Sequence, residues 1–148
     1  MTYEIPASIG VRMAQSGGEV YVLIGDGTYL MNPSEIVTSV MEGLKITVVI
    51  CVNHGFQSIK GLQLGTVGQA FGNEFRRRDA TTNRLEGDDV SVDFKQHAES
   101  MGAKGWYVTT PDDLCSALNE ARGESGACVI AAEISRVRQP EASGVWWD

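Results

Sequence analysis

Hydrophobic residues along this chain recur in two patterns, short apolar runs and longer stretches with helical spacing. The apolar runs predict strands over residues 20–24, 46–52, 102–108 and 127–134. The stretches with helical spacing predict helices over residues 3–14, 32–44, 92–101 and from residue 111 onward. Strands that alternate with helices are typical of a parallel sheet, because the crossover between parallel strands is usually a helix. We therefore expect an α/β fold, a three-layer doubly wound parallel sheet with helices on both faces.

Capping residues indicate where two of these helices begin. Thr110 precedes Pro111 and is expected to be the N-cap of the helix that follows. Asn32 precedes Pro33 in the same way, and Glu35 completes an arrangement like a capping box. We interpret Glu35 as a capping residue rather than as a catalytic acid.

The regular spacing of hydrophobic residues becomes weak between residues 55 and 87, where glycine is frequent. A segment of this length without a clear pattern is unusual inside a compact domain and tends to be functional or mobile. It contains the arginines Arg76, Arg77 and Arg78 beside Asp79. We interpret these arginines as a solvated or loop-anchoring cluster.

Glycine-flanked polar turns follow the first two predicted strands. Gly-Asp-Gly (residues 25–27) comes after the first strand, and Asn-His-Gly (residues 53–55) comes after the second. A right-handed crossover places both turns at the carboxyl ends of the strands, where open α/β sheets bind ligands. We therefore expect Asp26 and Asn53 to lie side by side. A carboxylate, an amide oxygen and exposed backbone carbonyls suit Mg²⁺ or Ca²⁺ rather than zinc.

The same turns are suited to an anionic ligand. Gly25 and Gly27 let the backbone approach a bulky anion without a Cβ in the way. A helix that begins near Asn32 would point its positive amino end toward the same rim. The predicted ligand is a diphosphate held by a divalent cation. Each turn considered alone is more often an ordinary glycine-containing loop.

Composition and charge narrow the class of protein. The 148 residues are 43% hydrophobic and 21% charged, enough for one domain with a buried core, and we treat residues 1–148 as a single domain. The net charge of −7, from 19 acidic and 12 basic residues, disfavours a nucleic-acid partner. No apolar run approaches the roughly 18 residues of a membrane span, and no signal peptide is indicated at the amino terminus.

The cysteines indicate a reducing compartment. Cys51, Cys115 and Cys128 are odd in number and lack CxxC spacing, so neither a disulfide framework nor a zinc site is indicated. Cys51 and Cys128 lie in apolar runs and are interpreted as small buried hydrophobic residues. We expect a cytoplasmic protein without a membrane partner.

Taken together, the two turns resemble the signature of thiamine diphosphate enzymes, which is Gly-Asp-Gly followed after a spacer by Asn. The resemblance implies the thiamine diphosphate-binding fold, with thiamine diphosphate and Mg²⁺ as cofactors. It implies that Asp26, Asn53 and the backbone carbonyl of Gly55 bind the metal. The residues that it places at the cofactor are Gly25, Asp26, Gly27, Thr28, Asn53, Gly55 and Phe56.

Histidine 54 (His54) follows Asn53 directly and would also lie beside the cofactor. It is the only side chain there of a type that titrates near neutral pH, which makes it a candidate for proton transfer. A histidine in such a loop can equally hydrogen-bond its own backbone, so the catalytic residue is unknown from sequence. His97 lies on a predicted helix among charged neighbours and is expected at the surface.

The resemblance extends over nearly the whole chain. It is to the carboxyl-terminal domain of the trihydroxycyclohexanedione hydrolases, a thiamine enzyme family of bacterial myo-inositol catabolism. The stretches that carry it are YEIPA, GDGTYLMNPSEIVT, EGLKI, NHGFQSIKGLQ, FGNEFR, VDFKQHAESMGAK and the closing Trp146-Trp147. One departure is Thr2, which stands where thiamine enzymes have glycine. The resemblance implies hydrolysis of a C–C bond that opens trihydroxycyclohexane-1,2-dione, a small cyclic diketone, to 5-deoxy-glucuronate.

The family also implies partners. In thiamine enzymes a glutamate of a pyrimidine-binding domain, normally from the opposite subunit, protonates the aminopyrimidine ring. Nothing in these 148 residues supplies that domain, so we expect a carboxyl-terminal fragment or one component of a split enzyme, inactive alone and part of a homo-oligomer. Two alternatives are open: a domain of another thiamine carboligase or decarboxylase acting on 2-oxo acids, and a non-catalytic interaction module. We expect Trp146-Trp147 to be a docking point.

Overall fold

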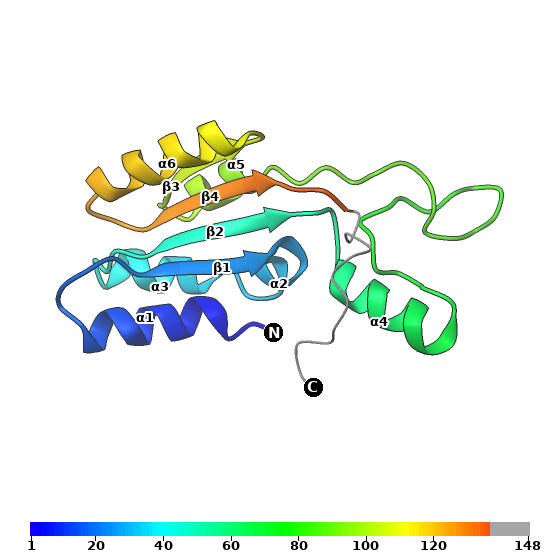
Figure 1. Cartoon of the computed structure of the whole chain (residues 1–148), viewed down its shortest axis with the longest axis horizontal. Coiled ribbons are helices and arrows are strands. Elements are labelled where there is room, and N and C mark those ends of the chain that lie inside the picture. The colour runs from blue at the N-terminus through cyan, green and yellow to red at the C-terminus, as the bar shows by residue number, and fades with distance from the viewer. Residues whose placement is uncertain (137–148) are drawn as a thin grey trace.

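The computed structural model describes residues 1–136. Trp146 and Trp147, expected to be a docking point, lie outside the described residues. The elements in chain order (Figure 1) are α1 (Glu4–Ala14), β1 (Tyr21–Gly25), α2 (Asp26–Met31), α3 (Glu35–Met41), β2 (Thr47–Val52), α4 (Gln57–Val67), α5 (Phe94–Ser100), β3 (Lys104–Val108), α6 (Pro111–Gly123) and β4 (Cys128–Glu133).

The named strands form one parallel sheet in the order β1-β2-β4-β3 (Figure 1). Gly25 of β1 pairs with Cys51 of β2, and Val52 of β2 pairs with Glu133 of β4. The carboxyl ends of these three strands therefore form one edge of the sheet, where both polar turns begin. The predicted parallel α/β architecture is confirmed.

Helices pack on both faces of the sheet, which gives the expected three layers. On one face α1, α3 and α5 bury a large apolar cluster that includes Ile36 and Phe94. On the other face α6 packs on β3 and β4 through Ala117 and its apolar neighbours. The described residues cover this second face only in part, because Tyr21 and Leu23 of β1 remain 44% and 72% exposed.

The predicted helix from residue 32 to 44 is wrong in its start. Asn32 is not an N-cap, because it ends α2 and its Oδ1 accepts a hydrogen bond from Ser34 Oγ at 3.0 Å. Helix α2 begins at Asp26, directly after β1, so the helix end nearest the edge of the sheet belongs to α2. Helix α3 begins at Glu35, and among the described residues no side chain caps it.

Residues 55–87 contain a helix that the pattern did not predict. Helix α4 ends at Gly68, whose φ of +70° is the left-handed conformation that favours glycine at a helix end. None of the α4 residues is buried, and Gly61 and Gly65 interrupt the sequence of this helix, which weakens the signal by which a helix is recognised. Between α4 and α5 the described chain forms only isolated bridges, one of which pairs Gly55 with Glu74.

Two predictions for single residues on helices have opposite outcomes. Thr110 is confirmed as the N-cap of α6, since its Oγ1 accepts a hydrogen bond from the Asp113 N–H at 3.2 Å. His97 is not a solvated surface residue, because its Nδ1 lies 3.0 Å from the hydroxyl of the fully buried Tyr29. The charged neighbours of His97 on α5 gave no indication of this contact, which comes from α2.

The two cysteines that were expected to be buried differ in their burial, and one of the clustered arginines anchors its loop. Cys128 is buried as expected, whereas Cys51 is only half-buried, because it lies on the partly covered face. Arg76 bonds the carbonyl of Gly87 at 3.2 Å and lies 3.9 Å from the Asp89 carboxylate, so this arginine anchors the loop. None of the helices within residues 1–136 is long and apolar enough to cross a membrane.

Candidate functional site

The two polar turns meet at a buried carboxylate. Asp26 is fully buried at the start of α2. Its Oδ2 accepts hydrogen bonds from the backbone N–H of Asn53 at 3.1 Å and of His54 at 2.6 Å, and its Oδ1 accepts one from Gly27 at 2.7 Å. The Gly55 N–H lies 3.3 Å from Oδ2. The expected juxtaposition of Asp26 with the second turn is therefore present.

Burial dominates the electrostatics of this carboxylate. It raises the pKa of Asp26 above its usual value, even though the backbone N–H groups of Gly27, His54, Gly55 and Asn53 act in the opposite direction. A buried negative charge that amide dipoles compensate only in part is stabilised further by a cation at its free lone pairs. An unpaired ionised carboxylate is thus disfavoured at this position, and either a proton or a bound cation offsets the cost of its burial.

The amide of Asn53 lies against two other oxygen atoms. In one orientation its nitrogen donates to Asp26 Oδ1 at 3.2 Å and to the Gly55 carbonyl oxygen at 2.9 Å. In the other orientation the amide oxygen faces these same two acceptors. Three oxygens at such distances repel one another unless a cation lies among them. The residues therefore offer a hydrogen-bonded arrangement without metal and an all-oxygen arrangement with metal.

This donor set fits Mg²⁺. Mg²⁺ is usually held by one or two carboxylates together with substrate phosphates and water, and Asp26 supplies one carboxylate. Asn53 and the Gly55 carbonyl supply neutral oxygens of the kind that accompany it. Within residues 1–136 no group of three or more His, Cys, Asp or Glu side chains forms a metal-binding cluster, so the donor chemistry here differs from that of a zinc site.

The conformation of the second turn depends on glycine. Gly55 has φ +147°, and a Cβ at this position would come 2.2 Å from the carbonyl oxygen of Asn73. The backbone segment that causes this contact also supports the turn, since the Phe56 N–H donates to the Asn73 carbonyl at 2.6 Å and the Phe75 N–H donates to the His54 carbonyl at 3.0 Å. Close pairing with residues 73–75 therefore requires glycine at 55.

Phe56 closes the site on the side of the first turn. A Cβ on Gly27 would lie 2.7 Å from the Phe56 ring, so this ring packs directly over the glycine. The same ring makes an edge-to-face contact with Phe75 at a centroid distance of 6.0 Å. Gly25 and Thr28 lie at the same end of β1, both half-buried, although the space around Gly25 would admit a Cβ. The phenyl ring and Gly27 thus pack against each other at the first turn.

The side chain of His54 contacts β4. Its Nε2 lies 2.6 Å from Glu133 Oε1, and Glu133 Oε2 accepts a hydrogen bond from the Tyr107 hydroxyl at 3.0 Å. Sequence reasoning missed Glu133 and Tyr107. The available signal for Glu133 was a carboxylate at the end of an otherwise apolar strand, at the same edge of the sheet as the two turns.

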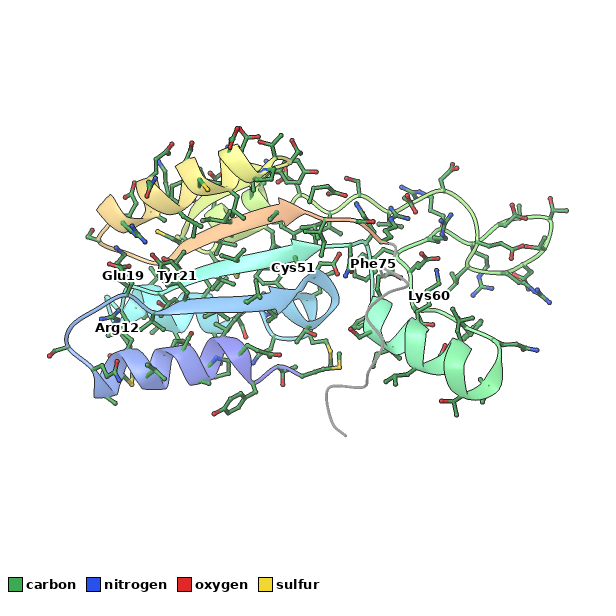
Figure 2. The ribbon with its side chains drawn as sticks, viewed as in Figure 1. Arg12, Glu19, Tyr21, Cys51, Lys60 and Phe75 are labelled. Atoms are coloured by element: carbon green, nitrogen blue, oxygen red, sulfur yellow. The ribbon has the colours of Figure 1, made fainter. Side chains whose placement is uncertain are left out.

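A cavity of about 790 Å³ lies between α4 and residues 69–86. Glu74 is the central charge, because Lys60 Nζ lies 2.9 Å and Arg76 Nε 3.4 Å from its carboxylate. The hydrogen bond from Lys60 is the largest effect that holds the pKa of Glu74 below its usual value. Figure 2 shows Lys60 and Phe75 beyond the end of β2, where Cys51 lies. The cavity thus adjoins the second turn, and two of its lining cations, Lys60 and Arg76, are paired with Glu74.

Comparison with known proteins gives a consistent picture. Residues 1–132 match the family described as "Thiamine pyrophosphate enzyme, C-terminal TPP binding domain". The chain is 37% identical over 147 residues to the 3D-(3,5/4)-trihydroxycyclohexane-1,2-dione hydrolase of Clostridium tetani. It is 36% identical to the enzyme of the same name from Geobacillus thermodenitrificans. Each alignment covers 99% of this chain and 23% of the relative, so the chain spans about a quarter of the length of these relatives.

Solved structures share the fold at lower identity. The thiamine diphosphate-dependent 4-hydroxybenzoylformate decarboxylase of Rhodococcus jostii RHA1 superposes with a TM-score of 0.75 at 20% identity, over 91% of this chain and 23% of that chain. The benzoylformate decarboxylase of Polynucleobacter necessarius superposes with a TM-score of 0.72 at 23% identity, over 93% and 23% of the two chains. These similarities support the three-layer α/β fold.

Proposed function

Because this chain belongs to the thiamine pyrophosphate enzymes, as a C-terminal TPP-binding domain of that family, we propose that its two polar turns hold the diphosphate of thiamine diphosphate through Mg²⁺. The observation that carries the proposal is the convergence of the Asn53 amide with the Asp26 carboxylate and the Gly55 carbonyl, the amide lying 3.2 Å from Asp26 Oδ1 and 2.9 Å from the carbonyl oxygen. Asp26 supplies the negative charge, and the two neutral oxygens complete the protein ligands.

The residues around this cluster bind and orient the cofactor. Gly25 is half-buried with open space beside it and leaves the start of the first turn accessible to diphosphate oxygens, with the half-buried Thr28 nearby. Phe56 covers Gly27 and shields that side of the turn from water. Thiamine diphosphate, when bound, supplies a nucleophilic carbon for attack on a carbonyl and an acceptor for the electrons of the broken C–C bond. The work of this chain is to fix the position of the diphosphate.

For the complete protein we infer hydrolysis of a C–C bond in a cyclic 1,2-diketone. The support is the identity of 37% and 36% to two relatives named trihydroxycyclohexanedione hydrolases, over 99% of this chain. The alternative, a decarboxylase acting on 2-oxo acids, has support only from structures of 20% and 23% identity. In this proposal a pyrimidine-binding domain supplies the glutamate that protonates the aminopyrimidine ring. That domain belongs to the rest of the protein or to an opposite subunit of a cytoplasmic homo-oligomer.

Thermal unfolding of the chain with Mg²⁺ and thiamine diphosphate tests the site. A ligand present at 100 times its Kd stabilises the folded state by about 2.7 kcal/mol. We expect the midpoint of unfolding to rise for the wild type and not for Asp26→Ala. Asp112→Ala is a matched control, because Asp112 lies exposed in the first turn of α6, and it should behave as wild type.

The outcome separates the hypotheses. If the wild type shows no rise, the measurement is repeated with a pyrimidine-binding domain of a relative added. Continued absence of metal-dependent binding would contradict the proposal and favour a non-catalytic interaction module. If binding is established, assays of the complete protein with the cyclic diketone and with 2-oxo acids distinguish the hydrolase from the decarboxylase.

A further inference from the structure

The backbone at position 54 is in a conformation that histidine adopts at a cost. His54 has φ +61°, in the left-handed region that glycine occupies freely and other residues rarely. Its backbone N–H bonds Asp26, and its carbonyl bonds the N–H of Phe75. Both backbone contacts are available to any residue, including glycine. A histidine at this position therefore contributes through its side chain.

The imidazole makes one short contact, and it is with Glu133. His54 Nε2 and Glu133 Oε1 are 2.6 Å apart, with side chains only 24% and 31% exposed. Glu133 ends β4 and pairs in register with Val52, the last residue of β2 before the turn. The neighbouring Ile134 N–H also donates to the Val52 carbonyl at 2.9 Å. The carboxylate thus projects from a rigid position directly beside the turn.

The second oxygen of the same carboxylate is also held. Glu133 Oε2 accepts a hydrogen bond from the Tyr107 hydroxyl at 3.0 Å, and Tyr107 belongs to β3, on the far side of β4. The row Tyr107, Glu133, His54 therefore joins three adjacent strands along the edge of the sheet. Because both carboxylate oxygens are bonded, the carboxylate has a defined orientation toward the imidazole.

We propose that Glu133 is a positioning residue for the Asn53–Gly55 turn, which it holds through the imidazole of His54, with Tyr107 orienting the carboxylate. Fixing the imidazole keeps the His54 N–H on Asp26 and keeps the Asn53 amide and the Gly55 carbonyl within reach of one cation. A test of this proposal by cofactor binding rests on the proposed function. A test by amide hydrogen exchange does not, because it uses the chain without ligand.

The experiment compares Glu133→Ala with Glu120→Ala in the whole chain. Glu120 is a matched control, since its carboxylate also bonds an aromatic donor, Trp106 Nε1, at 2.9 Å, but away from the site. Residue-resolved amide exchange by NMR should show the His54 and Gly55 amides exchanging about tenfold faster in Glu133→Ala only. Titration calorimetry should show Mg²⁺-dependent thiamine diphosphate binding weakened by about tenfold or more, as is usual when a residue that orients metal ligands is lost.

A double substitution separates positioning of the turn through His54 from general support of β4. His54→Gly can adopt the left-handed conformation but lacks the imidazole, so it should lose cofactor affinity about as much as Glu133→Ala does. In this background Glu133→Ala should cause no further loss. If Glu133→Ala causes a further loss in the His54→Gly background, or if Glu133→Ala and Glu120→Ala are indistinguishable in both measurements, the proposal is overturned. Absence of cofactor binding in the wild type, with the exchange effect present, would refute the proposed function alone.

Discussion

Replacing Gly55 by alanine is the most direct perturbation of the Asn53–Gly55 turn. The new Cβ would lie 2.2 Å from the Asn73 carbonyl oxygen and 2.8 Å from the Glu74 Cα, and both are backbone atoms that cannot rotate away. In addition, φ +147° is a conformation open essentially only to glycine, at a cost of about 1–3 kcal/mol for other residues. The segment at residues 73–75 must therefore separate from the turn.

The loss in the free energy of unfolding follows from the interactions that this separation breaks. It removes the hydrogen bonds from Phe56 N–H to the Asn73 carbonyl and from Phe75 N–H to the His54 carbonyl, each worth about 1 kcal/mol. Together with backbone strain, the loss is about 3–5 kcal/mol. For a chain of about 150 residues this lowers the unfolding midpoint by about 10 °C. Gly61→Ala, in α4 with no atom within 4 Å of the new Cβ, should instead stabilise the chain by about 0.4–1 kcal/mol.

Urea unfolding followed by far-UV circular dichroism measures both variants. Amide exchange at Phe56 and Phe75 reports in parallel whether the 73–75 segment has detached while the sheet stays folded. The steric reasoning is refuted if Gly55→Ala unfolds at the same urea concentration as the wild type and its Phe56 and Phe75 amides stay protected.

Three further expectations concern the packing around the site. Tyr29→Phe removes the hydrogen bond to His97 and should lower the free energy of unfolding by about 1 kcal/mol in urea titrations; an unchanged value would mean that the bond contributes nothing net. Thr110→Ala should cost about 1 kcal/mol by leaving the Asp113 N–H without its cap, and Thr110→Ser should recover most of it. Burial raises the pKa of the Cys128 thiol from 9.0 to about 11. Because the unfolded thiol ionises first, the stability difference between wild type and Cys128→Ala should be constant below about pH 8 and decrease toward pH 11, and a flat difference would contradict the burial argument.

Topology made part of the site predictable. The turns at residues 25–27 and 53–55 each follow an apolar strand, and two parallel strands joined by a crossover end at the same edge. That reasoning needs only the order of elements, and the structure places the Asn53 N–H 3.1 Å from the Asp26 carboxylate. The helix start near Asn32 failed for a local reason, since the chain turns into α2 already at Asp26 and thereby divides the predicted helix.

Contacts between side chains on non-neighbouring segments were not predictable. The bond between His54 and Glu133 depends on the register that sets Val52 opposite Glu133, and no periodicity in the sequence specifies that register. The bond between His97 and Tyr29 depends likewise on how α5 packs on the sheet. Helix α4 was missed because Gly61 and Gly65 interrupt its sequence and no residue of it is buried in the fold. For the two side-chain bonds, the information lies in pairing across the fold rather than along the chain.

The strand order has a consequence for how the protein folds. Strand β4 occupies the interior of the sheet, between β2 and β3, yet it is the last strand of the described chain to be synthesised. Its pairing with β2 is highly non-local, with Glu133 and His54 79 positions apart. Such contacts slow folding and leave earlier strands with unpaired edges in the meantime. The nascent chain therefore cannot complete the contacts of the Asn53–Gly55 turn until β4 has left the ribosome.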